Sequence, residues 1–159
     1  MRSTLDGLVT ALDDLEAFVG SIEPVNDLLT KHKDDVVRHY LRVRKRLDYA
    51  AFVVALYAAF EKFVEDLAWS HAELSSYGTK YSDLPEKLRE SHLKKSAELL
   101  GRSRLGEGRY VGVNSVDVVG NLYDCLSGKD EYRLNKHAVV HHESNLRFDI
   151  VQGLFAAIG

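Results

Sequence analysis

The segment from Lys136 to Arg147 contains the densest group of chemically capable side chains in this chain. Its members are Lys136, His137, His141, His142, Glu143, Ser144, Asn145 and Arg147. His137 and His141 are four residues apart, a spacing that puts both on one face of a helix. With Glu143 they could bind a metal ion. Alternatively, an imidazole could transfer protons during RNA cleavage while a cation stabilises the phosphate charge. Spacing alone does not decide between these two chemistries.

The metal interpretation lacks a complete ligand set. A metal site needs a third or fourth ligand in a defined geometry, and histidines in a polar connection do not supply one by themselves. We therefore predict no metal and no cofactor.

A second group of cations lies near the middle of the chain. Arg38, Arg42 and Arg46 follow one another at intervals of four, and Lys45 adjoins them. This spacing places the guanidinium groups on one helix face, where they could contact the phosphates of RNA. The alternative is a solvated face on which Asp34 and Asp35 pair with the cations one turn later.

Composition limits the compartment and the kind of protein. The chain has 159 residues, of which 45% are apolar and 28% charged, with a net charge of -3. These values predict one globular domain, residues 1-159, that does not hold nucleic acid by bulk charge. The longest apolar stretch, Ala50 to Phe60, is about half a membrane span. No export signal is visible, and the lone Cys125 predicts a buried thiol. We expect a cytoplasmic protein without a membrane segment.

Apolar periodicity predicts helices throughout the first half of the chain. A first helix carries Leu5 to Ile22 on one face, and Pro24 is well placed to begin a second. Val25 to Ser75 contains no proline or glycine, which predicts one long helix or two with a bend near Leu47 to Tyr49. The segment Ala50 to Trp69 is apolar on several sides and is expected to be the central helix of a bundle.

The second half predicts shorter helices. One follows Pro85 and closes at Gly101, and a loop to Asn114 includes a short extended piece at Tyr110 to Val113. Ser115 caps a helix that ends near Gly128, and a polar connection, Lys129 to Asn145, leads into a helix from Leu146 to Ile158. The predicted fold is all-α, an antiparallel helical bundle of about five to six helices around a central apolar helix.

Two phrases resemble a known family. Leu56 to Glu65, which reads Leu-Tyr-Ala-Ala-Phe-Glu-Lys-Phe-Val-Glu, is similar to the central-helix signature of the MAE-type branch of the HEPN superfamily. Glu143 to Arg147, continuing through Leu154 and Phe155 to Gly159, resembles the segment that precedes the last helix of that branch.

The resemblance implies an antiparallel bundle that commonly forms dimers. In many relatives this bundle is a metal-independent endoribonuclease of toxin-antitoxin or antiphage defence systems, with a catalytic motif of an arginine, a polar residue, a few others and a histidine. We therefore expect a homodimer, an RNA substrate, and a cognate antitoxin or defence partner protein.

The chain departs from that motif at one position that matters. Its closest match, Lys136 to His141, has lysine in place of arginine, and lysine lacks the bidentate guanidinium fork. If the segment is catalytic, we expect His141 to be the acid-base group, Lys136 the phosphate stabiliser and His137 the polar neighbour. The resemblance places the family motif after Ser144 to Leu146, so we expect a fragment or a short form. The alternative function is a non-catalytic dimerisation or partner-binding module.

Overall fold

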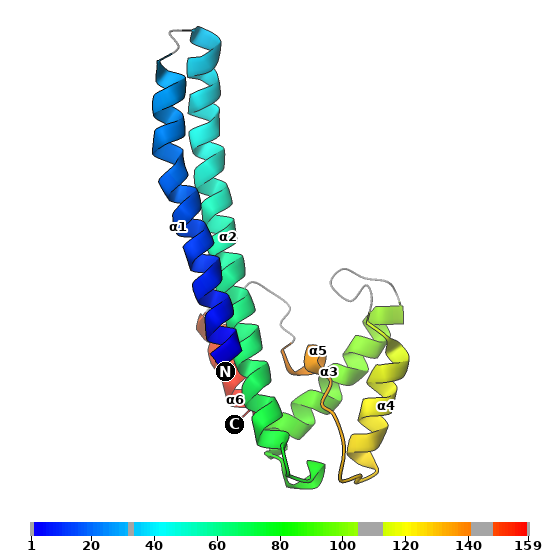
Figure 1. The fold of residues 1–159 in the computed structure, drawn as a ribbon. Coiled ribbons are helices and arrows are strands. Elements are labelled where there is room, and N and C mark those ends of the chain that lie inside the picture. Colours follow the sequence, from blue (N-terminus) through cyan, green and yellow to red (C-terminus); the bar gives the residue numbers. More distant parts are fainter. Residues whose placement is uncertain (1, 32–33, 105–112, 141–147, 159) are drawn as a thin grey trace. The chain divides into compact units, whose positions relative to one another are not determined.

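The chain folds as helices alone in the part that the structure describes. A computed structural model describes residues 2-31, 34-104, 113-140 and 148-158. These residues form six α-helices, one 3-10 turn and no strand (Figure 1). The prediction of an all-α fold with five to six helices is confirmed. The elements are α1 (Arg2–Thr30), α2 (Asp35–Ser76), η1 (Tyr81–Asp83), α3 (Glu86–Arg104), α4 (Ser115–Leu126), α5 (Lys136–Val139) and α6 (Phe148–Ile158).

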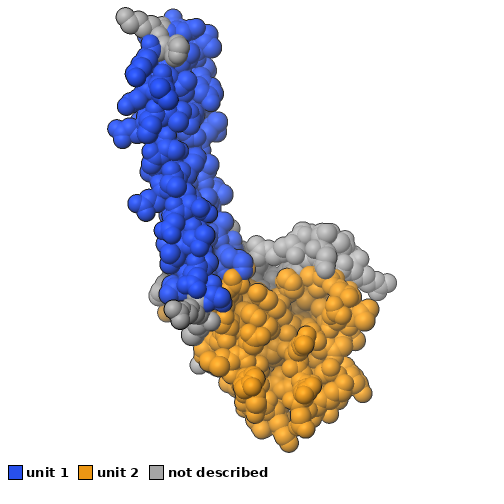
Figure 2. All heavy atoms as spheres, viewed as in Figure 1, with its two compact units in different colours: residues 1–64 blue, residues 65–159 orange. Residues whose placement is uncertain are grey.

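Contacts divide the chain into two compact units. The hairpin unit is Met1–Val64, and the C-terminal unit is Glu65–Gly159 (Figure 2). In the hairpin unit, α1 and the first part of α2 run side by side in opposite directions (Figure 1). The C-terminal unit contains the rest of α2 and all later elements. No helix among the described residues is both long enough and apolar enough to cross a membrane. The single domain over residues 1-159 stays a prediction.

Helix α1 is longer than predicted. It passes through Gly20 and Pro24 and ends at Thr30, so the prediction of a new helix at Pro24 is wrong. A proline inside a helix removes its own N–H donor and crowds the preceding turn, but it leaves the flanking bonds in place. Partly buried Ile22 and Val25 lie on either side of Pro24. Because most helical stability in proteins comes from packing of an apolar face, burial of these side chains favours a helix that continues through Pro24.

The turn between α1 and α2 falls where neither proline nor glycine marks it. The Asp34 carboxylate accepts a hydrogen bond from the Val36 N–H at 2.8 Å, and the Asp34 carbonyl accepts from the Arg38 N–H at 3.1 Å. Asp34 is thus the N-cap of α2. The predicted single helix from Val25 is therefore wrong, and α2 runs unbroken through Leu47 to Tyr49.

Burial of the predicted central helix is uneven. Val64 and Ala68 are at most 4% exposed, whereas Val53 and Phe60 are 45% and 46% exposed. The prediction of an apolar helix buried on several sides therefore holds only for the later part of the segment. In the hairpin unit α2 lies beside one helix, which covers only one of its faces.

Helix ends in the C-terminal unit follow local chemistry. Gly78 has a φ of 67°, which suits the residue that ends α2. Helix α3 continues past Gly101 to Arg104, so the predicted closure at Gly101 is wrong. The cap of α4 is Asn114 rather than Ser115, because the Asn114 side chain accepts from the Val116 N–H at 3.0 Å.

Other predicted boundaries fall on residues without a described structure. The extended piece at Tyr110 to Val113 lies outside the described residues except for Val113, and the helix predicted to begin at Leu146 is described from Phe148 onward. The polar connection contains the short helix α5.

Helix α3 is the centre of the C-terminal unit. It packs against α4, α5 and α6. Its inward face is fully buried and mixes leucines with two polar side chains, and it consists of Leu88, His92, Ser96 and Leu99. These positions are three or four residues apart, as expected for one helix face. The polar pair on this face fixes the segment that carries the candidate site.

Candidate functional site

Asn135 anchors the start of α5 in the core. Its side chain is buried, and its amide nitrogen donates to Ser96 Oγ at 3.0 Å and to the Val118 carbonyl at 3.2 Å. Its amide oxygen accepts from Asn121 Nδ2 at 3.0 Å. One side chain therefore connects α3, α4 and α5. Because buried polar groups must find partners, this network fixes the backbone immediately before Lys136.

His92 completes the anchor from α3. Its Nε2 accepts the Asn135 backbone N–H at 2.9 Å, so the ring proton sits on Nδ1. Nδ1 then donates to Tyr81 Oη at 3.1 Å, and that hydroxyl donates to the Arg89 carbonyl at 3.3 Å. Burial lowers the pKa of His92 to about 4 and raises the pKa of Tyr81 to about 12. Both groups are neutral near pH 7 and serve as structural hydrogen-bond partners.

Lys136 and His137 are exposed residues that follow this anchor. Lys136 Nζ lies 3.2 Å from Asp66 Oδ1, and the lysine side chain keeps 45% of its surface exposed. The two residues line a pocket of about 240 Å³, together with Leu99, Val113, Asn114, Asp117, Val118 and Asn135. The structure thus brings a cation, an imidazole and the Asp117 carboxylate to one pocket.

The third predicted catalytic residue, His141, lies outside the described residues. Glu143, the third ligand of the metal interpretation, lies outside them too. Among the residues with a described structure, no group of three His, Cys, Asp or Glu side chains could hold a metal ion. The chemistry available at the described pocket is proton transfer by an imidazole or a carboxylate, with charge stabilisation by an ammonium group.

The four predicted RNA-binding residues lie in the hairpin unit, apart in sequence and unit from the pocket. Arg38, Arg42, Lys45 and Arg46 are all exposed on α2, and their spacing places them on one face of that helix, as predicted. Arg38 Nη2 lies 3.3 Å from Asp35 Oδ1, which is the helix pair expected for a solvated face. RNA binding by this row stays a prediction.

Cys125 is a buried thiol, as predicted. It is 2% exposed, and its Sγ donates to the Arg133 carbonyl at 3.6 Å. Burial, followed by the nearby Asp124 carboxylate, raises the pKa of the thiol to about 11. Cys125 is protonated near pH 7, so it is a packing residue and a poor nucleophile.

Sequence reasoning did not identify the residues that position α5. His92 falls within the helix predicted after Pro85, and Asn135 falls within the predicted polar connection from Lys129 to Asn145. The one available signal was the spacing of Leu88, His92 and Ser96, which put two polar side chains on the apolar face of α3. Such side chains must be hydrogen-bonded when buried.

Comparison with known proteins places the chain in a family. The family model described as RiboL-PSP-HEPN matches residues 21–159, which is most of the chain. No curated protein and no solved structure matches it. The match covers both phrases from which the HEPN superfamily was predicted, and this prediction is confirmed. The chain belongs to the RiboL-PSP-HEPN family of the HEPN superfamily.

Proposed function

We propose that this chain is a metal-independent endoribonuclease domain of a prokaryotic RNA-targeting defence or toxin system. The observation that carries the proposal is the placement of Lys136 and His137. Both are exposed at a pocket, while the buried hydrogen bonds of Asn135 hold their backbone. A fixed backbone under exposed charged groups suits catalysis by positioning. A cognate antitoxin or defence protein would restrain such an activity.

The proposed reaction uses the ribose 2′-hydroxyl as nucleophile. A histidine, which we assign as His141, removes the 2′-hydroxyl proton while the 2′-oxygen attacks the adjacent phosphorus. The bond from phosphorus to the 5′-oxygen breaks, and that oxygen takes up a proton from solvent water, while the protonated histidine returns its proton to solvent. The products are a 2′,3′-cyclic phosphate and a 5′-hydroxyl. Lys136 stabilises the negative charge on the phosphate oxygens, and His137 is the polar neighbour.

Cleavage assays test this proposal directly. We expect the purified chain to cleave single-stranded or structured RNA between mildly acidic and neutral pH, with EDTA present. Lys136→Ala and His141→Ala should each lower the rate about 100-fold, the usual scale for losing a charge stabiliser or a general base.

The matched control is Lys129→Ala. Lys129 is an exposed lysine of the same polar connection, and it pairs with Asp124 instead of lining the pocket. This variant should cleave at the wild-type rate. Absence of cleavage at every pH tested, or an unchanged rate in His141→Ala, contradicts the proposal.

Asp66 is expected to restrain Lys136. Asp66→Asn removes the carboxylate that lies 3.2 Å from the Lys136 ammonium group. An RNA phosphate then binds that ammonium group without competition from a carboxylate. Because exposed ion pairs contribute up to about 1 kcal/mol, we expect RNA to bind up to about five times more tightly. Fluorescence anisotropy with a labelled single-stranded RNA measures the Kd. An unchanged or weaker affinity would show that Lys136 does not contact RNA.

A partner-binding module is the second candidate function. Exposed apolar residues of the hairpin unit favour it, because such surfaces often bind proteins. This function predicts that His141→Ala has no effect and that charge on an exposed apolar face does. The finer assignment to the MAE-type branch stays a prediction.

A further inference from the structure

One face of the hairpin unit exposes a row of large apolar side chains from each helix. In α1 the row is Leu5, Val9, Leu12 and Val19; in α2 it is Tyr49, Val53, Leu56 and Phe60. These eight side chains are between 40% and 72% exposed. Spacings of three, four and seven residues keep each row on one side of its helix.

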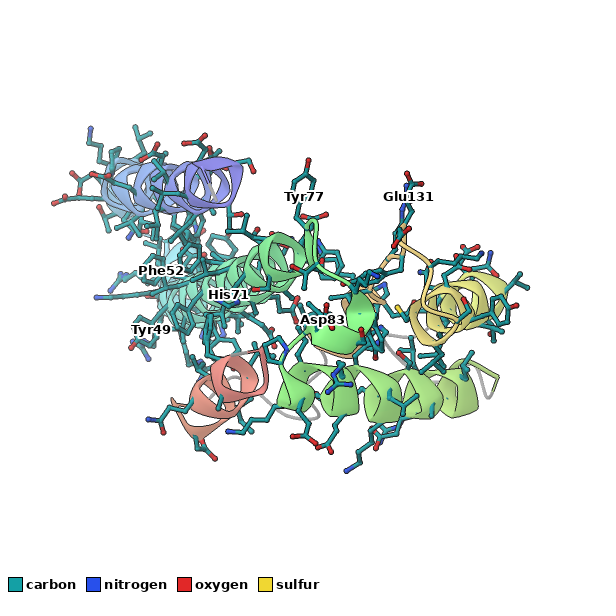
Figure 3. All side chains as sticks on the ribbon, turned by 90° about the horizontal axis from the view of Figure 1, so that it is seen from below. Tyr49, Phe52, His71, Tyr77, Asp83 and Glu131 are labelled. Carbon is teal, nitrogen blue, oxygen red and sulfur yellow. The ribbon has the colours of Figure 1, made fainter. Side chains whose placement is uncertain are left out.

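One residue of each row, Val19 of α1 and Tyr49 of α2, lines the same recess, which places the two rows on one face of the hairpin. A cavity of about 340 Å³ is lined by Val19 and Ile22 of α1 and by Lys45, Asp48, Tyr49 and Phe52 of α2. Tyr49 and Phe52 lie on the same side of α2 (Figure 3). We call this surface the hairpin face. The recess offers a place for a side chain from a partner.

The same face becomes charged toward the turn between the two helices. Glu23 and Asp27 continue the α1 row, four and eight residues after Val19. Arg42 and Lys45 continue the α2 row, seven and four residues before Tyr49. All four charged residues are exposed. One helix therefore adds acidic groups to the hairpin face, and the other adds basic groups.

We propose that the hairpin face is an interface between two copies of this chain, with α1 of one copy against α2 of the other. In a two-fold dimer the same patch meets itself, so each acidic row lies against a basic row. The apolar rows bury one another in the same arrangement. RNA fits this face less well, because Glu23 and Asp27 would repel its phosphates. This inference goes beyond the proposed ribonuclease and does not depend on it.

Two neighbouring valines provide a matched test of the apolar part. Val53 lies on the hairpin face, whereas Val54, which is 68% exposed, lies about 140° around the helix from Tyr49. We expect wild type and Val54→Glu to sediment as dimers. Val53→Glu should raise the dimer Kd about 50-fold or more, because it buries a charge at the centre of the interface. Circular dichroism checks that both variants keep their helices.

Exchanging charges between chains tests the pairing of α1 with α2. The acidic variant is Arg42→Glu with Lys45→Glu, and the basic variant is Glu23→Lys with Asp27→Lys. Each alone should be mainly monomeric, since like charges meet twice in its dimer. Their equimolar mixture should form a heterodimer, because both contacts are then attractive. Charge pairs within one chain cannot produce this recovery.

Several results would overturn the inference. One is a wild-type chain that stays monomeric up to about 100 μM, where an interface with a micromolar Kd is populated. Others are equal effects of Val53→Glu and Val54→Glu, or a mixture that stays monomeric. If the acidic variant still forms a dimer but no longer binds RNA, then Arg42 and Lys45 bind RNA and not a second copy of the chain. Sedimentation is measured without RNA, so the outcome is independent of the cleavage assays.

Discussion

Replacing Asn135 by alanine is expected to lower the free energy of unfolding of the C-terminal unit by about 4 kcal/mol. The side chain makes three hydrogen bonds in or near the core, to Ser96, Val118 and Asn121. Alanine leaves a buried hydroxyl and a buried carbonyl without this partner, and each loses about 1 to 3 kcal/mol. The backbone bond to His92 remains possible, so the effect comes from the side chain alone.

Urea denaturation followed by fluorescence measures this loss. Trp69 is the single tryptophan of the chain and lies in the C-terminal unit. The matched control is Asn114→Ala, which removes an exposed N-cap and should cost only about 1 kcal/mol. Similar midpoints for the two variants would mean that the Asn135 network does not hold α5. RNA cleavage by Asn135→Ala should also fall if α5 carries the active groups.

Lowering the pH from 6.5 to about 4 is expected to decrease the free energy of unfolding by about 3 kcal/mol through the protonation of His92. Burial lowers its pKa from 6.5 to about 4 in the folded chain, so the unfolded chain binds the proton more readily. The contribution is therefore fully present above pH 6.5 and is lost as the pH falls from 6.5 toward 4. Protonation would also place a donor on Nε2, which faces the Asn135 N–H.

Comparing His92→Gln with Leu88→Ala isolates this effect. Both variants should be less stable than wild type at pH 8, because both side chains are about 1% exposed. Only the glutamine variant should lose the part of the slope that a titrating imidazole supplies between pH 6.5 and 4. Carboxylates contribute equally to the two curves. If both variants keep the wild-type slope in urea titrations, His92 is not the group responsible.

Local signals predicted helices well and their boundaries less well. Apolar periodicity from Leu5 to Ile22 located the start of α1, and the cap near Ser115 with the end near Gly128 located α4. The turn before Asp35 was missed because its only marker is the Asp34 cap, a residue type common inside charged helices. Pro24 was misread because the packing of α1 decides whether a helix continues through a proline.

The candidate site was only partly predictable for a related reason. Lys136 and His137 stood out by residue type and proved to be neighbours at one pocket. Their supports are distant in sequence: the bond from Asn135 to His92 joins residues 43 apart, and that from Lys136 to Asp66 joins residues 70 apart. No periodic pattern reports such pairs. Val53, Leu56 and Phe60 of the hairpin face were likewise expected to lie in a central bundle helix because their segment is apolar, yet they are exposed.

The buried thiol of Cys125 makes the C-terminal unit observable on its own. Cys125 is the single cysteine and lies in the C-terminal unit. A thiol reagent can reach it only when α4 moves away from the segment around Arg133. The labelling rate in native buffer therefore reports the opening equilibrium of that unit alone. Opening of the hairpin unit leaves the labelling rate unchanged, so one unmodified chain reports the opening of its C-terminal unit separately from that of the hairpin.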